Sequence, residues 1–212
     1  MAVIAAVPAT RRVNHRVADM SYAADVGTDG ICTVDIPAVA TSSATALANA
    51  VVIAAAGNVA PTVVQTEALM GRYGRNITVS GGTGSGTLVG YDYLGQPIRE
   101  TFALAAGPVV GKKMFKDVSH LIVPAAATIS IGTGVILGVP YKVLSSGILG
   151  ELTSDVTPTA GAILPGVTTQ TLTSGDPRGA YTPNLVPDGV RTYRFTCIVD
   201  RSNLHGAAHA LV

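Results

Sequence analysis

The chain has 212 residues, a formal net charge of +1 and only 13% charged residues, about half the roughly 25% of an ordinary soluble domain. This length accommodates one large domain or two small ones. The near-neutral balance gives no electrostatic basis for binding nucleic acid or an anionic membrane. Because so few charges protect a free surface from association, we expect neighbouring chains to cover much of it.

The first nine residues, MAVIAAVPA, are apolar but have no basic residue ahead of them, unlike a secretory signal. No stretch reaches the roughly 18 to 20 consecutive apolar residues of a membrane span. Cys32 and Cys197 are too few and too far apart for a disulfide framework. They could pair across a sheet, but we expect two small buried apolar residues. Synthesis in the cytoplasm is therefore expected.

Residues 1–30 have no sustained periodicity and are predicted to form an extended arm that lies on a neighbouring subunit. A partly ordered terminus is the alternative. The arm carries a short basic cluster without the interleaved aromatic residues of a nucleic-acid patch. The cluster consists of Arg11, Arg12, His15 and Arg16.

Residues 31–36 alternate in polarity and predict a strand. The hydroxyl residues 41–43 could cap a short helix through the Ala-rich block that ends near Gly57. The β-branched residues 51–53 favour a strand instead. We predict a short helix followed by an extended piece, and then a strand over 61–70.

The stretch from Tyr73 to Leu104 predicts three short strands separated by two turns. Residues 76–80 alternate, and the glycine cluster Gly81–Gly86 then marks a turn. A second turn over Asp92–Gly95 has Asp first and Gly last, as a type I turn prefers. The strand that Pro97 opens should place four residues on one face: Ile98, Glu100, Phe102 and Leu104.

Further strands are predicted towards the C-terminus. Val118, His120 and Ile122 should share one face of a strand, and the alternation resumes at residues 129–131. Residues 135–143 are apolar at strict period two, with Pro140 indicating an edge or a bulge. The last strand, over 190–200, should face inward through Tyr193, Phe195, Cys197 and Val199.

Short strands parted by Gly/Pro turns predict an all-β fold, with a β-sandwich or jelly-roll-like core and an extended N-terminal arm. We divide the chain into the arm (1–30), the sandwich core (31–146), and the final core strand with a tail (190–212). The remaining segment, 147–189, is rich in Thr, Gly and Pro and is either a long excursion or a second, smaller lobe.

Little in the sequence indicates chemistry. The glycine cluster lacks the Lys and the following helix of a phosphate loop, and its spacing fails the dinucleotide fingerprint. His205 and His209 are four residues apart but have no acidic third ligand beside them. His120 is expected within or beside a sheet. With no carboxylate pair in view, we predict no catalytic, cofactor-binding or metal-binding residues, although hydrolases can hide such pairs.

Several stretches resemble structural proteins of tailed-bacteriophage particles. The resemblance covers roughly half to two-thirds of the chain, does not include the first 60 residues, and is carried by turn-and-strand signatures. These are YGRNITV (73–79), GYDYLGQPIRETFAL (90–104), PVVGKKMFKDVSHLIV (108–123), ISIGTGVILGVPYKV (129–143), GDPRGAYTPN (175–184) and DGVRTYRFTC (188–197).

Within that group the chain looks most like a capsid decoration (cement) protein, which ties neighbouring capsid subunits together on the outside of the head. The resemblance implies a non-enzymatic role on the virion, the major capsid protein as partner, and self-association as a dimer or trimer at a capsid symmetry axis. Another virion component (tail, baseplate or head fibre) is the alternative, and a carbohydrate-binding β-sandwich or an enzyme is less favoured. The capsid-contact candidates are Arg11, Arg12, His15 and Arg16, and the oligomer or loop-contact candidates are Pro158, Pro165, Arg178 and Tyr181.

Overall fold

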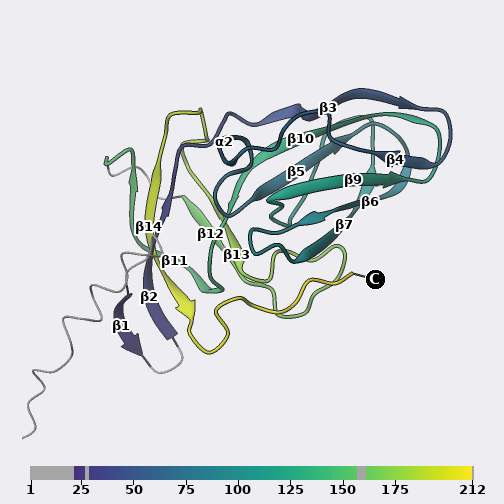
Figure 1. Ribbon diagram of the computed structural model, residues 1–212. Coiled ribbons are helices and arrows are strands. Elements are labelled where there is room, and N and C mark those ends of the chain that lie inside the picture. Colours follow the sequence, from purple (N-terminus) through teal and green to yellow (C-terminus); the bar gives the residue numbers. More distant parts are fainter. Residues whose placement is uncertain (1–21, 27–28, 157–160, 212) are drawn as a thin grey trace, which may run out of the picture.

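The computed structural model describes residues 22–26, 29–156 and 161–211. Strands account for 53% of the structure and helix for 2%, which confirms the predicted all-β class. All strand pairs of the described residues are antiparallel and belong to three sheets (Figure 1). The predicted N-terminal arm lies almost wholly outside the described residues.

Sheet A contains, in spatial order, β1 (Tyr22–Val26), β2 (Asp29–Ile36), β14 (Tyr193–Asp200) and β11 (Val143–Thr153). Sheet B contains β12 (Ala162–Pro165), β13 (Gly179–Thr182), β10 (Ala127–Gly138), β5 (Arg75–Ser80) and β8 (Val109–Val110), with β3 (Ser43–Ile53) also paired to β10. Sheet C contains β4 (Gly57–Val59), β9 (Asp117–Val123), β6 (Gly84–Tyr91) and β7 (Pro97–Leu104). The short helix α2 spans Glu67–Met70.

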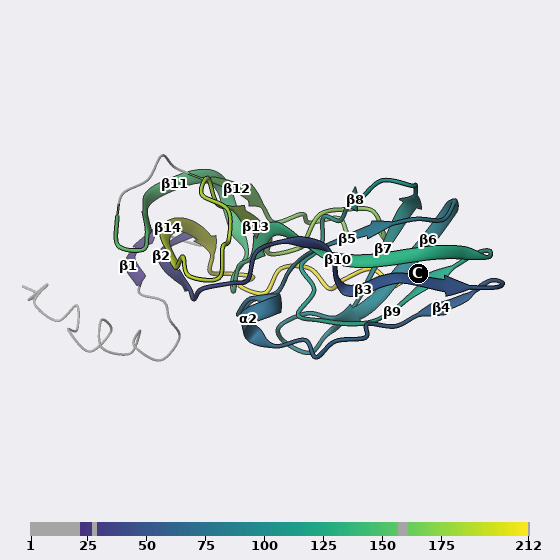
Figure 2. The ribbon, with the colours of Figure 1, turned by 90° about the horizontal axis from the view of Figure 1, so that it is seen from above.

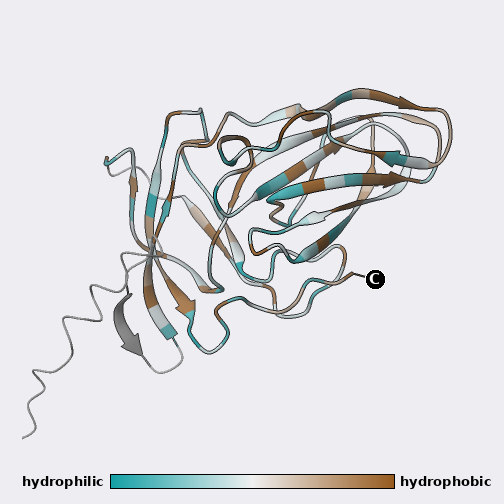
Figure 3. Cartoon of the chain, viewed as in Figure 1, coloured by the Kyte–Doolittle hydropathy of each residue, from teal (hydrophilic) through white to brown (hydrophobic). Residues whose placement is uncertain are grey.

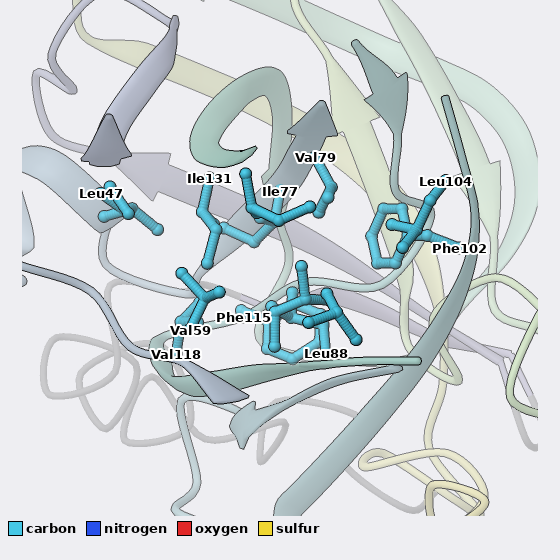
Figure 4. Packing of buried hydrophobic residues seen from close by; sticks show 14 of the residues in the cluster. Leu47, Val59, Ile77, Val79, Leu88, Phe102, Leu104, Phe115, Val118 and Ile131 are labelled. Atoms are coloured by element: carbon cyan, nitrogen blue, oxygen red, sulfur yellow. The ribbon is translucent and has the colours of Figure 1, made fainter. Parts of the chain in front are cut away.

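Sheets B and C enclose the first hydrophobic core, and we call this part the sandwich (Figure 4). Alternation of polarity along its strands is visible in Figure 3 and turns one side of each strand inward. In β7 the inward side is the predicted one, since Ile98, Glu100, Phe102 and Leu104 are buried. Leu88 of β6 and Leu121 of β9 pack into the same core.

Sheet A covers the second core, on the side of the molecule opposite the free end of the sandwich (Figure 2). Cys32, Val34 and Ile36 of β2 point inward, as predicted, beside Phe195 and Cys197 of β14. Tyr181 of β13 stacks on Phe195 with ring centroids 4.3 Å apart. These side chains pack sheet A against the β12–β13 end of sheet B.

Strand β10 belongs to both cores. Its first half pairs with β3 and β5, and its end pairs with β13. Ile129 and Ile131 lie in the sandwich core, whereas Leu137 lies in the core beneath sheet A. One continuous strand therefore connects the two cores.

Three predicted elements differ from the structure before residue 100. Residues 43–53 form β3 and not a short helix, because β10 supplies strand pairing that outweighs the helix propensity of alanine. Residues 61–66 are irregular and lead into α2, so the predicted strand over 61–70 is wrong. The glycine turn is shorter than expected, since β6 already begins at Gly84.

One predicted face and one predicted strand also change. A register shift between β6 and β9 pairs Val89 with His120 and Gly90 with Val118, so Ser119 is an extra residue. Such a bulge reverses the alternation, which leaves Ile122 exposed while Val118 stays buried. The strand predicted over 135–143 ends at Gly138, and β11 begins separately at Val143.

The segment 147–189 contributes most of β11, all of β12 and all of β13. Its loop 167–176 lies against the edge of the sandwich, where Thr101 N donates to Leu172 O at 2.8 Å. This segment thus supplies strands to sheets A and B and covers part of the β7 edge.

Candidate functional site

The sandwich ends in four loops that are free of charge. The loops are 54–56, 81–83, 105–108 and 124–126, and they contain only Ala, Gly, Pro and Thr. Pairing of Ile53 with Ala127, of Ser80 with Ser130 and of Gly84 with Leu104 brings them to one end, away from sheet A (Figure 2). We call this end the sandwich tip.

Close contacts hold the loops of the tip together. Gly81 N donates to Ala105 O at 2.7 Å. A side chain at Gly81 would place its Cβ 1.9 Å from Thr128 O, and φ here is +92°, so only glycine fits this turn. Gly81 therefore serves tight packing of loop 81–83 against β10, in agreement with the predicted turn.

The surface beside the tip is apolar as well as uncharged. Val52 is 75% exposed and Val110 is 57% exposed, and Ile122 is also exposed. Residues 36–66, which include β3 along one edge of sheet B, contain no charged residue. Edge strands are usually protected by charges or proline against pairing with other chains. A charge-free edge next to an exposed apolar end is typical of a surface that another protein covers.

Many of the charged residues of the described chain are buried and therefore absent from its surface. The buried ones are Arg75, Asp92, Glu100, Lys113, Lys142, Glu151, Asp176, Arg178 and Asp200. A surface that was already short of charge by composition is thus depleted further.

Arg75 shows how these buried charges are used. Its backbone pairs with Phe115 in both directions at 3.0 Å. Its guanidinium donates to carbonyl oxygens of Ala40, Leu69 and Gly134. These carbonyls lie before β3, in α2 and in β10, so the side chain joins three segments at the junction between the cores.

A second buried group, the ionic cluster, lies around Asp92 in the turn between β6 and β7. Arg178 Nη1 is 2.9 Å from Asp92 Oδ2, and Arg178 Nε is 3.7 Å from Asp176 Oδ1. His209 Nε2 is 3.4 Å from Asp92 Oδ2, and the guanidinium lies over the Tyr93 ring at 5.0 Å from its centroid. Burial alone would raise the pKa of Asp92, but His209 and Arg178 hold it below its ordinary value.

The ionic cluster connects parts of the chain inside the fold. Arg178 Nη1, Asp92 Oδ2 and the His209 ring nitrogens lie close together, but their geometry does not meet the requirements of a hydrogen bond. Asp92 Oδ1 accepts from Leu94 N and Gln96 N, and Asp176 accepts from Met114 N. The cluster therefore connects the sandwich with the segment before β13 and with the C-terminal tail, and it offers no open face to a substrate.

A shallow groove of about 330 Å³ lies beside sheet A. Asp35 and Asp155 lie in it, and Arg194 is 2.5 Å from Asp35 and 4.0 Å from Asp155. Because the two carboxylates already share a guanidinium, neither is an unpaired acid or base. The groove does not bring together a nucleophile, a base and an oxyanion donor, which acyl or phosphoryl transfer would need.

The histidines that the sequence singled out lie in three different places. His120 lies in β9, as expected, with Nδ1 3.0 Å from Ser119 Oγ. His205 lies against the Tyr141 ring, and His209 is buried in the ionic cluster. No three His, Cys, Asp or Glu side chains of the described residues are grouped as metal ligands. In the same part of the chain, no helix is long and apolar enough to cross a membrane.

The contact candidates have different outcomes. Arg11, Arg12, His15, Arg16 and Pro158 lie outside the described residues. Pro165 is exposed at the end of β12, an edge strand of sheet B.

Arg178 and Tyr181 are 1% and 0% exposed, so they are interior residues and the contact prediction is wrong for both. Arg178 is held by the ionic cluster. Tyr181 donates to Glu151 Oε1 at 2.5 Å beneath sheet A. Both lie in the Thr-, Gly- and Pro-rich segment 147–189, which was expected to make contacts as an excursion or small lobe, but each has a partner within the fold.

Sequence reasoning missed the sandwich tip. Its signal was present as four short runs, AAA, GGT, AAGP and PAA, each of which connects a strand of sheet B with a strand of sheet C. Each run by itself is an ordinary turn, and only the strand registers show that they meet. Comparison with models of known protein families, with curated proteins and with solved structures finds no match to this chain.

Proposed function

We propose that this protein is a non-enzymatic structural component of a tailed-bacteriophage particle, and specifically a decoration (cement) protein of the outer capsid. The observation that carries the proposal is the exposed, charge-free sandwich tip. It is supported by the burial of nine charged side chains and by the resemblance of the turn-and-strand motifs to phage particle proteins. A rigid scaffold with an apolar end fits a protein that binds other subunits.

The proposed partner of the tip is the major capsid protein. Interface cores are depleted in Lys, Glu and Asp, and the tip has none of them. Small side chains allow close approach of backbones and lose little conformational entropy on contact. A protein that binds only the assembled lattice stabilises it by its difference in affinity between assembled and free subunits. Many copies on one head add their effects through multivalent binding.

The proposed second contact is the N-terminal arm, with its basic cluster Arg11, Arg12, His15 and Arg16. Self-association as a dimer or trimer at a symmetry axis would let arms of neighbouring copies reach adjacent capsid subunits. Deletion of residues 1–20 is expected to leave the fold intact and to weaken attachment to the particle. Full binding by this truncated chain would exclude the arm as an anchor.

The decisive experiment locates the protein on the particle. A low-resolution electron-microscopy reconstruction of wild-type particles is compared with one of particles from a deletion mutant. Difference density on the outer capsid supports the cement role, and density on the tail would replace it by a tail or baseplate role. If purified particles do not contain the protein, the structural role is overturned.

A further inference from the structure

The C-terminal tail, residues 201–211, contains no helix or strand and runs from the end of β14 towards the sandwich (Figure 1). Its first half is held by the backbone. Leu204 O accepts a hydrogen bond from Lys142 N at 2.7 Å. Gly206 lies so close to Pro177 that a Cβ at this glycine would be 2.4 Å from Pro177 O. The tail is thus fixed as far as residue 206.

The second half of the tail is held differently. In the part of the chain that the structure describes, residues 207–211 make no backbone hydrogen bond. His209 is nevertheless buried, and its side chain is only 1% exposed. Its Nε2 lies 3.4 Å from Asp92 Oδ2 in the turn between β6 and β7. One side chain therefore anchors the last residues of the tail in the ionic cluster.

The His209 ring meets more negative than positive charge. Arg178 lies between two carboxylates, with Nη1 2.9 Å from Asp92 Oδ2 and Nε 3.7 Å from Asp176 Oδ1. Two buried carboxylates thus share one guanidinium, and an uncompensated charge in the interior is costly. A proton on His209 supplies the missing positive charge. In agreement with this, burial raises the pKa of Asp92, and His209 is the strongest of the groups that lower it.

Three other titratable side chains surround the cluster. Tyr93 lies against the Arg178 guanidinium, and burial raises the pKa of its hydroxyl, which therefore stays neutral. Lys113, between β8 and β9, interacts electrostatically with Asp176 and with Glu100 of β7. Burial raises the pKa of Glu100 to about 7. Ionisation of Glu100 must therefore be separated from that of the histidine.

We propose that His209 is a pH-operated latch, which holds the end of the C-terminal tail in the ionic cluster when protonated and releases residues 207–211 when neutral. The protonated ring pairs with Asp92 and balances the second carboxylate, and contacts between charged groups are stronger than those between neutral ones. Since the ring gains its partner only in the docked state, docking is favoured at low pH. It weakens as the pH rises past the range in which histidines ordinarily lose their proton.

Release of the tail would change the interior of the molecule as well as its end. Asp92 and Arg178 join the sandwich to the segment before β13, and His209 packs against them. Withdrawal of the ring would admit water to this ion pair and weaken the connection between the two cores. Residues 201–206 would stay in place, because their backbone contacts do not depend on the histidine. The inference concerns this chain alone and stands independently of any role on a particle.

A spin label at the end of the tail tests the latch in the full chain. Leu211→Cys introduces a thiol at a position that is 38% exposed, whereas the native Cys32 and Cys197 are buried and should stay unlabelled. Electron paramagnetic resonance separates immobilised from mobile label. The ratio of mobile to immobilised label should rise about tenfold or more between pH 6 and pH 8.5, as loss of one charged contact would cause. An unchanged ratio overturns the proposal.

Three substitutions in the labelled chain identify the titrating group, with circular dichroism to verify the fold. His209→Gln removes the titratable ring, so the label should be mobile at both pH values. His205→Gln alters the exposed histidine of the same tail and should keep the wild-type response. Glu100→Gln should also keep it. A response that persists in His209→Gln, or disappears in Glu100→Gln, would exclude His209 as the latch.

Discussion

Arg178 Nη1 lies 2.9 Å from Asp92 Oδ2, and the two side chains are 2% and 0% exposed. They are 86 positions apart in the sequence, on the turn after β6 and just before β13. The pair thereby fixes the sandwich against the strands of the second core. Removing one member leaves the other charge buried and unpaired.

Asp92→Asn is therefore expected to lower the free energy of unfolding by about 3 to 5 kcal/mol, as measured by urea denaturation at pH 7. The pKa of Asp92 is lowered in the folded state, so its contribution is present above the ordinary carboxyl range and is lost as the pH falls below it. The control is Glu67→Gln, which breaks a solvent-exposed pair with Arg72 and should cost at most about 1 kcal/mol. An equal effect of the two substitutions on the free energy of unfolding would contradict the placement of Asp92 in a buried ion pair.

Ionisation of Glu100 should give the opposite dependence of folding stability on pH. Its folded-state pKa is raised from 4.5 to about 7, so the folded state binds more protons than the unfolded state between these values. Stability should accordingly fall by about 3 kcal/mol as the pH rises from 4.5 to 7, before other groups are counted. Glu100→Gln should flatten that part of the curve. Unfolding free energies of both proteins from pH 4 to 8 check this, and parallel curves would rule it out.

Phe102 lies in the sandwich core and is 2% exposed. Phe102→Ala removes an aromatic ring from a closely packed site, and we expect a loss of about 3 to 5 kcal/mol in unfolding free energy. Val110→Ala, at a 57% exposed position, is the matched control and should change little. A loss below about 1 kcal/mol for Phe102→Ala would mean that this face of β7 is not part of the core.

Cys32 and Cys197 lie directly opposite each other on β2 and β14, and both are free and buried. Burial raises the pKa of the Cys197 thiol to about 12, and burial together with Cys197 raises that of Cys32. Since the thiolate is the reactive form, neither should react with a thiol reagent before the protein unfolds. Ala55→Cys, exposed at the tip, is the positive control and should react at once. Rapid labelling of the wild-type protein would refute the buried placement.

A charge introduced at the sandwich tip should weaken binding to the particle without disturbing the fold. Ala55→Glu and Ala106→Glu each place a carboxylate on an exposed loop of the tip, where the fold can accept it. Under the cement proposal, either substitution should reduce the amount of protein that co-sediments with particles lacking it, because an unpaired charge would be desolvated on contact. Val190→Glu, at a position 78% exposed beside sheet A, is the control. Undiminished co-sedimentation of the tip variants would exclude the tip as the contact.

The extent to which the sequence predicted the fold depends on how local the decisive interaction is. Both β7 and β14 were predicted with the correct inward faces, including buried Glu100, because their alternation is regular and nearby turns fix their limits. β3 was missed because its strand character comes from pairing with β10, some 80 residues away. The orientation of Ile122 was missed because a single bulged residue, Ser119, reverses the alternation.

The candidate site was less predictable than the fold. The Ala and Gly loops of the tip have no chemical signature and become a surface only when sheets B and C are both in place, because each loop connects a strand of one sheet to a strand of the other. Arg178 and Tyr181 were expected at a contact surface, since nothing near them in the sequence reveals their buried partners Asp92 and Glu151. Ion pairs and hydrogen bonds between residues far apart in the chain leave no local pattern from which they could be predicted.

The passage of β10 through both cores has a mechanical consequence. Antiparallel strands are hydrogen-bonded to β10 at both of its ends. These are β3 and β5 near the tip and β13 near sheet A. A force applied to the tip along β10 would act in shear on the backbone hydrogen bonds between β10 and these strands. Many of these hydrogen bonds would then have to break together instead of one after another. Force applied at one end of the molecule is thereby transmitted to the other end without an intervening hinge.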